Sequence, residues 1–164
     1  MNTNRRQDTF PPPMIRITKS FTFEMAHALL GYDGACRNIH GHSYQLFVTV
    51  KGVPKDKQEH PKDGMVLDFV DLKKIIENHV VEALDHALVL NAATPPEVVK
   101  SLKDQYEKVI LFPFQPTSEN LVLYMVERIL PVLPTDVSLS HVRLAETATA
   151  YIEWFSEDNT DAGV

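Results

Sequence analysis

Two stretches in the first third of the chain alternate apolar and polar side chains as β-strands do. In residues 15–28 the apolar row ends in His27, and in residues 40–51 a second row begins with His40 and His42. Side chains two positions apart on a strand point to the same face. Turn residues fill the segment between the two stretches. We therefore expect two strands, and their pairing as a hairpin would place His27 opposite the other two histidines.

Apolar side chains that recur every three or four residues predict two main helices. The first is expected to be capped by Asp68 and to run to about Leu84. The second is expected to begin at Thr117 or Ser118 and to stop at Pro131. The connection between them is expected to hold a short helix and a short strand, over residues 97–106 and 108–112.

Two more alternating stretches, residues 137–146 and 148–155, predict a strand pair with a bend at Glu146. The main elements then follow the order strand, strand, helix, helix, strand, strand. This order predicts an α+β fold, in which a four-stranded antiparallel sheet carries two helices on one face. Such a sheet has two open edges, which are often paired with another subunit.

Length and composition indicate one globular domain, expected over residues 14–156. The polar residues 1–13 and the acidic residues 157–164 are expected to be flexible tails. A net charge of -6 argues against a nucleic-acid-binding protein. No apolar run reaches the length of a membrane span, and no secretory signal begins the chain. With a single cysteine, the sequence favours a cytoplasmic enzyme or binding protein.

Three histidines form the candidate metal site. His40 and His42 lie two positions apart on one predicted strand, so their rings share a face about 6–7 Å apart at the backbone. That separation suits two ligands of one ion, and the hairpin would add His27. Three imidazoles that leave one position open are typical of catalytic Zn²⁺ rather than of a closed structural site.

The only cysteine, Cys36, lies four residues before His40 and has three interpretations. It could be a fourth metal ligand, since this spacing permits ligation. It could be a general base, because a nearby metal and imidazoles favour the thiolate form. An inert buried thiol is the commoner fate of a lone cytosolic cysteine. Its position beside the histidines favours the base.

Two other signals are weak when each is taken alone. Asp85 directly precedes His86 at the end of the first predicted helix, where a carboxylate could orient an imidazole. A solvated acid and a histidine that benefits from the helix dipole would give the same pattern. Glu146 ends a predicted strand, and an acid in that position is usually just solvated.

Six sequence motifs, however, occur in the order known from one family. They are Phe-Glu-Met-Ala-His (23–27), Cys-x-x-x-His-Gly-His (36–42), Gly-Met-Val-Leu-Asp-Phe (64–69), Leu-Asp-His (84–86), Pro-Thr-Ser-Glu-Asn (116–120) and Glu-Thr (146–147). On these motifs the chain resembles the 6-pyruvoyl-tetrahydropterin synthase family. It is most similar to the bacterial branch that makes 6-carboxy-5,6,7,8-tetrahydropterin for queuosine biosynthesis.

The resemblance implies a tunnelling fold (T-fold), whose subunits pair edge to edge into trimers that stack as hexamers, with active sites between subunits. It implies zinc on His27, His40 and His42, with Cys36 as the proton acceptor. The remaining roles that it implies are a proton relay (Asp85 and His86), an anchor for the pterin ring that also joins the relay (Glu146) and further pterin contacts (Thr117 and Ser118).

The substrate that the resemblance implies is 7,8-dihydroneopterin triphosphate. The products would be 6-carboxy-5,6,7,8-tetrahydropterin, triphosphate and acetaldehyde. Two other enzymes remain open, a 6-pyruvoyl-tetrahydropterin synthase and a lyase that yields 6-hydroxymethyl-dihydropterin. A zinc-stabilised or pterin-binding module without activity is disfavoured, because Cys36, Asp85, His86 and Glu146 would then all be present without use.

Overall fold

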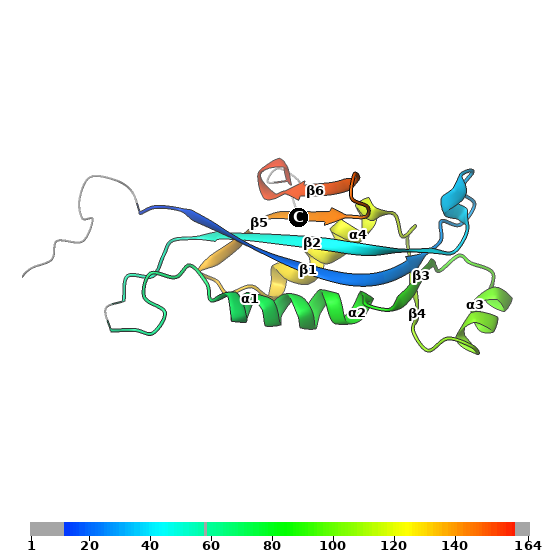
Figure 1. Cartoon of the computed structure of the whole chain (residues 1–164), viewed down its shortest axis with the longest axis horizontal. Coiled ribbons are helices and arrows are strands. Elements are labelled where there is room, and N and C mark those ends of the chain that lie inside the picture. Colours follow the sequence, from blue (N-terminus) through cyan, green and yellow to red (C-terminus); the bar gives the residue numbers. More distant parts are fainter. Residues whose placement is uncertain (1–11, 58, 160–164) are drawn as a thin grey trace, which may run out of the picture.

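A six-stranded sheet forms the centre of the computed structural model, which describes residues 12–57 and 59–159 (Figure 1). Most of the two expected tails, residues 1–11 and 160–164, lies outside this part of the chain. The spatial order of the strands is β4-β3-β1-β2-β5-β6. The strands are β1 (Ile15–His27), β2 (His40–Gly52), β3 (Ala87–Asn91), β4 (Val109–Phe112), β5 (Val137–Ala145) and β6 (Tyr151–Phe155).

The long β1–β2 hairpin sets the frame of the sheet. Its antiparallel register runs from the pair Ile15–Gly52 to the pair His27–His40. Phe23 and Tyr44 are buried and stack on each other, with ring centroids 5.2 Å apart. The alternation read from the sequence therefore predicted both the hairpin and its inward face correctly.

Helices cover one face of this sheet. Figure 1 shows α1, α2 and α4 running alongside the β1–β2 hairpin. The core lies between them and the strands, where Leu72, Ile76, Leu121 and Met125 are fully buried. The helices are α1 (Phe69–Ile76), a π-helical turn (Glu77–Val81), α2 (Glu82–Leu84), α3 (Pro96–Lys103) and α4 (Ser118–Ile129), with 3₁₀ turns at Ala35–Arg37, Leu130–Val132 and Ser156–Asn159.

The α+β class is confirmed, but the expectation of four antiparallel strands was wrong. β3 and β4 extend the sheet, and the pairs β1–β3 and β3–β4 are parallel. Parallel strands need a crossover, which the helical residues 69–84 provide between β1–β2 and β3. β3 is a short apolar run without alternation, as is common for a strand buried on both faces. Because β3 does not alternate, its residues were predicted to be the end of a helix and the start of a connection.

None of the helices in residues 12–57 and 59–159 combines the length and the apolar character that a membrane crossing requires.

Replacing the N-cap of α1 should destabilise the domain. Asp68 Oδ1 accepts a hydrogen bond of 2.8 Å from the Val70 N–H. We expect Asp68→Ala to lower the free energy of unfolding by about 1 kcal/mol, measured in urea. Asp104→Ala is the control, because the Asp104 carboxylate forms an exposed ion pair with Lys100 and caps no helix start in the described residues. Equal losses in the two variants would contradict a capping role for Asp68.

Candidate active site

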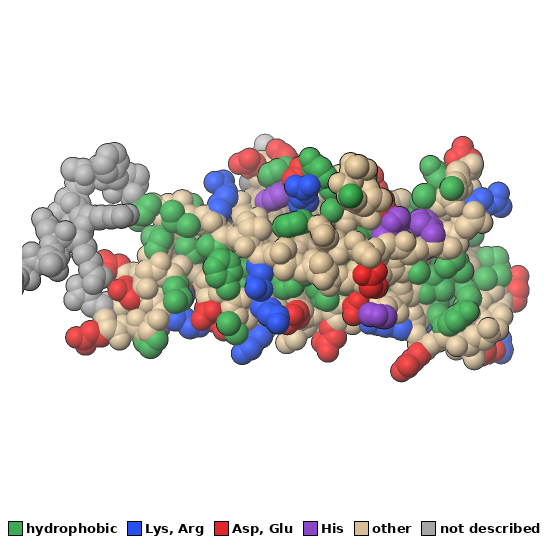
Figure 2. Space-filling view, in the orientation of Figure 1, with side chains coloured by type: hydrophobic (Ala, Val, Ile, Leu, Met, Phe, Trp, Pro, Cys, Tyr) green, Lys and Arg blue, Asp and Glu red, His purple; other side chains and the backbone are tan. Residues whose placement is uncertain are grey.

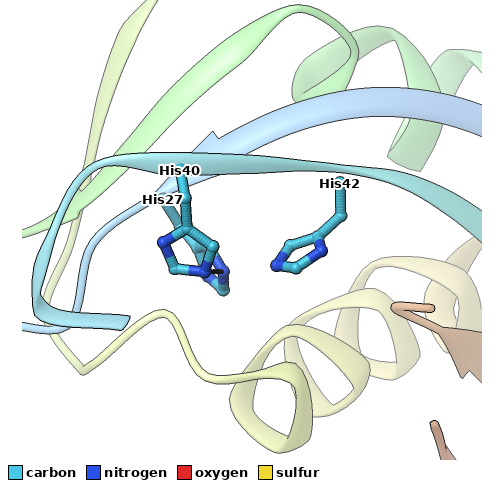
Figure 3. A group of neighbouring side chains, drawn as sticks. All are labelled: His27, His40 and His42. Atoms are coloured by element: carbon cyan, nitrogen blue, oxygen red, sulfur yellow. Dashed lines mark hydrogen bonds between the residues drawn. The ribbon is translucent and has the colours of Figure 1, made fainter. Parts of the chain in front are cut away.

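Three histidine side chains converge where the β1–β2 hairpin opens into its loop. His27 ends β1 and pairs with His40, the first residue of β2, and His42 follows on the same face. One ring nitrogen from each lies within 4.8 Å of the other two. Figure 3 shows the three rings turned toward a common space. The sequence prediction that these residues come together is correct.

Backbone carbonyls select the tautomer of two of these rings. His27 Nδ1 lies 2.7 Å from Pro116 O, and His40 Nδ1 lies 2.8 Å from Asn38 O. A carbonyl oxygen only accepts, so both Nδ1 atoms carry the proton and both Nε2 atoms of the neutral rings are left with lone pairs. An Nδ1–H bound to a backbone carbonyl is the usual arrangement around a metal-ligating histidine.

The lone pairs on these nitrogens face one another. His27 Nε2 and His40 Nε2 are 3.2 Å apart, a contact that repels unless a proton or a cation lies between them (Figure 3). His42 Nε2 is buried and has no hydrogen-bond partner within the described residues. Burial lowers the pKa of His27, which keeps its ring neutral and able to ligate. The donor set therefore fits a metal ion.

Cys36 lies on the loop that joins His27 to His40 along the chain. The residue is half-buried in the 3₁₀ turn Ala35–Arg37. Its sulfur is not among the ligand atoms that gather within 4.8 Å of one another in the described chain. The sulfur is therefore outside the candidate ligand set, and the interpretation of Cys36 as a base stays a prediction.

Glu146 brings a carboxylate to the histidines from the other end of the chain. It follows β5, and its Oε1 lies 3.6 Å from His27 Nε2 and 3.5 Å from His42 Nε2. Ser118 Oγ donates to the same oxygen over 3.0 Å, and the Tyr44 hydroxyl lies 3.4 Å away. The two hydroxyls fix this carboxylate oxygen, and no protein group hydrogen-bonds to Oε2 anywhere in the described residues.

Tyr44 is a site residue that the sequence reasoning placed on the right face but gave no role. Its ring contacts His42 edge-on, with centroids 5.5 Å apart. Burial raises the pKa of its hydroxyl, and the charges of Glu146 and Cys36 raise it further. Tyr44 therefore remains a neutral donor to Glu146. Its position in phase with His40 and His42 was the signal available in the sequence.

Ser118 and Thr117, which the resemblance places at the pterin, have contacts within the protein that the sequence did not show. Thr117 caps α4, with its Oγ1 accepting from the Asn120 N–H at 3.3 Å, and the buried Ser118 is bonded to Glu146. In this chain Ser118 therefore orients the carboxylate.

Asp85 and His86 form a pair on the opposite face of the sheet. The Asp85 carboxylate accepts from the Glu24 N–H at 2.9 Å and lies 3.0 Å from His86 Nδ1. The Glu24 N–H bond, followed by the neighbouring His86 and Lys108, lowers the pKa of Asp85. His86 has a positive φ of 58° and a largely exposed ring. Asp85 thus orients the imidazole and leaves its Nε2 open to solvent.

No hydrogen bond or ion pair links this pair to the three histidines within the described part of the chain. Glu24 alternates with Met25 along β1 and therefore points away from the histidine face. His86 lines a groove of about 1120 Å³, whose lining also includes His42, Leu102 and Tyr106. Figure 2 shows hydrophobic side chains gathered at this end of the molecule. The sequence predicted the pair, and one chain leaves it apart from the metal site.

Comparisons with known proteins agree with this picture. The family model described as 6-pyruvoyl tetrahydropterin synthase matches residues 16–157. A 6-carboxy-5,6,7,8-tetrahydropterin synthase from Haemophilus influenzae is 34% identical over 86% of this chain and 99% of its own. A dihydroneopterin monophosphate aldolase from Pyrococcus furiosus is 32% identical over 80% and 89% of the two chains. A 6-pyruvoyl tetrahydropterin synthase structure from Caenorhabditis elegans matches with a TM-score of 0.62 and 26% identity, covering 90% and 99%.

The fold and the histidine site define a T-fold protein with a candidate metal centre. The chain belongs to the 6-pyruvoyl tetrahydropterin synthase family. The T-fold and the family expected from the sequence motifs are therefore confirmed, with six strands in place of four.

Proposed function

We propose that this protein is a zinc-dependent lyase that converts 7,8-dihydroneopterin triphosphate into 6-carboxy-5,6,7,8-tetrahydropterin, with consumption of water and release of triphosphate and acetaldehyde. The observation that carries the proposal is the convergence of three Nε2 atoms, two of them with fixed tautomers, beside a carboxylate. The 34% identity to a protein named for this product supports the choice of reaction. The reaction belongs to queuosine biosynthesis, and the cytoplasm is the proposed compartment.

His27, His40 and His42 would hold the zinc ion. When bound, zinc would supply Lewis-acid chemistry to the side-chain hydroxyls of the pterin and make the neighbouring C–H positions more acidic. Imidazole nitrogens without thiolates favour zinc among the available non-redox ions.

Cys36 is the proposed base that removes a carbon-bound proton from the substrate side chain. Glu146 would receive the amino and amide N–H groups of the pterin ring, since a carboxylate accepts two parallel hydrogen bonds. Ser118 and Tyr44 hold Oε1 of this carboxylate by donating to it. Two parallel bonds from the ring would therefore use Oε2 fully and share Oε1 with these two hydroxyls.

The Asp85–His86 pair is the proposed proton relay, and it would act on the site of a neighbouring subunit. The placement of His86 on the opposite face of its own sheet supports this assignment. The proposed assembly is a hexamer of two trimers, in which the free edges of β4 and β6 pair with other copies. The active sites would then lie between subunits.

A second candidate, favoured by one comparison, is a lyase that cleaves the side chain differently. The relative named dihydroneopterin monophosphate aldolase is 32% identical, so the family includes members named for a different reaction. A 6-pyruvoyl-tetrahydropterin synthase is the other alternative within the family. A module that only binds zinc or pterin is disfavoured, because the thiol of Cys36 and the imidazole of His86 would then have no use.

Product analysis separates these functions. We expect the purified zinc-loaded protein, incubated with 7,8-dihydroneopterin triphosphate, to form a carboxypterin and an equal amount of acetaldehyde, both identified by mass. A pyruvoyl product without acetaldehyde would indicate the synthase, and a hydroxymethyl product would indicate the aldolase. Unchanged substrate would reject the carboxypterin and pyruvoyl enzymes, and the aldolase would be rejected only if the monophosphate also stays unchanged.

A further inference from the structure

The loop that carries Cys36 is fastened to a distant part of the chain by one side chain. Gln115 Oε1 accepts from the Leu30 N–H at 3.1 Å, and Gln115 Nε2 donates to Leu30 O at 2.5 Å. The amide thus pairs with both polar groups of one backbone residue, as a neighbouring strand would. Gln115 and Leu30 are 85 residues apart in the sequence.

Gln115 is itself held firmly at the start of α4. Its carbonyl oxygen accepts from the Thr117 N–H at 2.8 Å and from Asn120 Nδ2 at 2.9 Å. The next residue, Pro116, is buried, and its carbonyl orients His27. Two consecutive residues of this segment therefore contact the metal site and the cysteine loop.

The point where Gln115 binds is coupled to Cys36 inside the loop. The Leu29 N–H donates to Cys36 O at 2.9 Å, and Leu29 directly precedes the residue that Gln115 holds. The rest of the loop is supported by short turn bonds, from Arg37 N to Gly34 O and from Asn38 N to Ala35 O. These bonds keep the turn intact but do not fix it to the sheet or to α4.

We propose that Gln115 is a positioning residue that latches the Cys36 loop to the N-terminal end of α4 and so fixes the thiol relative to His27. The effect on catalysis rests on the proposed role of Cys36 as base, whereas the latch itself does not. A reacting group displaced by about 1 Å can lose about 10²-fold in rate, so such a latch matters even at an exposed position.

The test replaces one donor without changing the shape of the side chain. Gln115→Glu puts a carboxylate oxygen against Leu30 O, where an N–H was, and breaks the latch. Because the chain contains one cysteine, alkylation by iodoacetamide reports on Cys36 alone. We expect faster alkylation and faster amide hydrogen exchange in residues 28–39 without substrate, while bound zinc is unchanged.

Loss of the latch should also slow turnover, and it should lower kcat more than it changes KM. We expect kcat to fall about ten-fold or more, with KM within about two-fold, because the pterin-binding carboxylate is not altered. Gln115→Ala removes both bonds without adding charge, and it should change all readouts in the same direction. Gln45→Glu is the matched control, since Gln45 is exposed on the opposite face of β2 from His42.

Each result decides the proposal. Wild-type alkylation and exchange in both Gln115 variants would overturn the latch. A loosened loop with unchanged kcat would overturn the positioning role. Loss of zinc in both variants would show that the segment acts on His27 instead, and would overturn the inference as stated. Failure of the proposed function would appear separately, as absence of the carboxypterin product from the wild-type protein.

Discussion

Cys36→Ala is expected to lower kcat by about 10²–10⁴-fold, the usual contribution of a positioned general base. Cys36 is half-buried in the loop between His27 and His40, and its sulfur is outside the set of ligand atoms. Its removal should therefore stop proton abstraction and leave the metal in place. Steady-state turnover of 7,8-dihydroneopterin triphosphate and elemental analysis of the same sample measure the two effects.

Asp33→Ala is the control for damage to the loop, because Asp33 is exposed in the turn that precedes Cys36. It should keep both turnover and zinc. Full turnover of Cys36→Ala would remove the base assignment. Zinc loss in Cys36→Ala would instead revive the interpretation of this cysteine as a metal ligand.

The sequence predicted the convergence of the three histidines because all of them lie on one hairpin. Strand alternation fixes the face of His42, and the matching apolar rows of the two strands favour the register that sets His27 opposite His40. Strand alternation was enough for this prediction, because the two strands follow each other in the chain and both alternate regularly. The caps of α1 and α4 were predictable for the same reason.

Contacts between distant segments were not predictable in this way. The hydroxyls of Tyr44 and Ser118 meet on Glu146 only after α4 and β5 have packed against the hairpin. The sequence motifs gave Ser118 a role at the pterin but did not show its hydrogen bond to the Glu146 carboxylate. Alternation also missed β3, whose apolar run carries no period, and with it the parallel part of the sheet.

The sequence also did not predict on which face of the sheet His86 lies. The order Asp-His is visible in the sequence, but its position depends on the helical crossover and on the positive φ of His86. Because β3 lies parallel to β1, the pair is brought next to Glu24 and away from His27. Within the described part of one chain, no hydrogen bond or ion pair joins the pair to the histidines, which is why the proposed relay acts between subunits.

The double variant His40→Ala/His42→Ala is expected to lose bound zinc and to reduce turnover to background. One imidazole, His27, would remain of the three that converge, and a single neutral ligand holds zinc weakly compared with three. Zinc per chain, measured by elemental analysis of a protein purified without a histidine tag, should fall close to zero.

A second measurement separates lost metal from a lost fold. Zinc that binds the native state raises its stability, by about 4 kcal/mol when free zinc is about 1,000 times its Kd. The wild-type protein should therefore unfold at a higher temperature with zinc than with chelator, and the double variant should unfold at the same temperature in both. His79→Ala is the matched control, because His79 is exposed on the π-helical turn and outside the histidine cluster. Zinc retained in the double variant, together with a zinc-dependent rise in unfolding temperature, would show that the metal binds elsewhere.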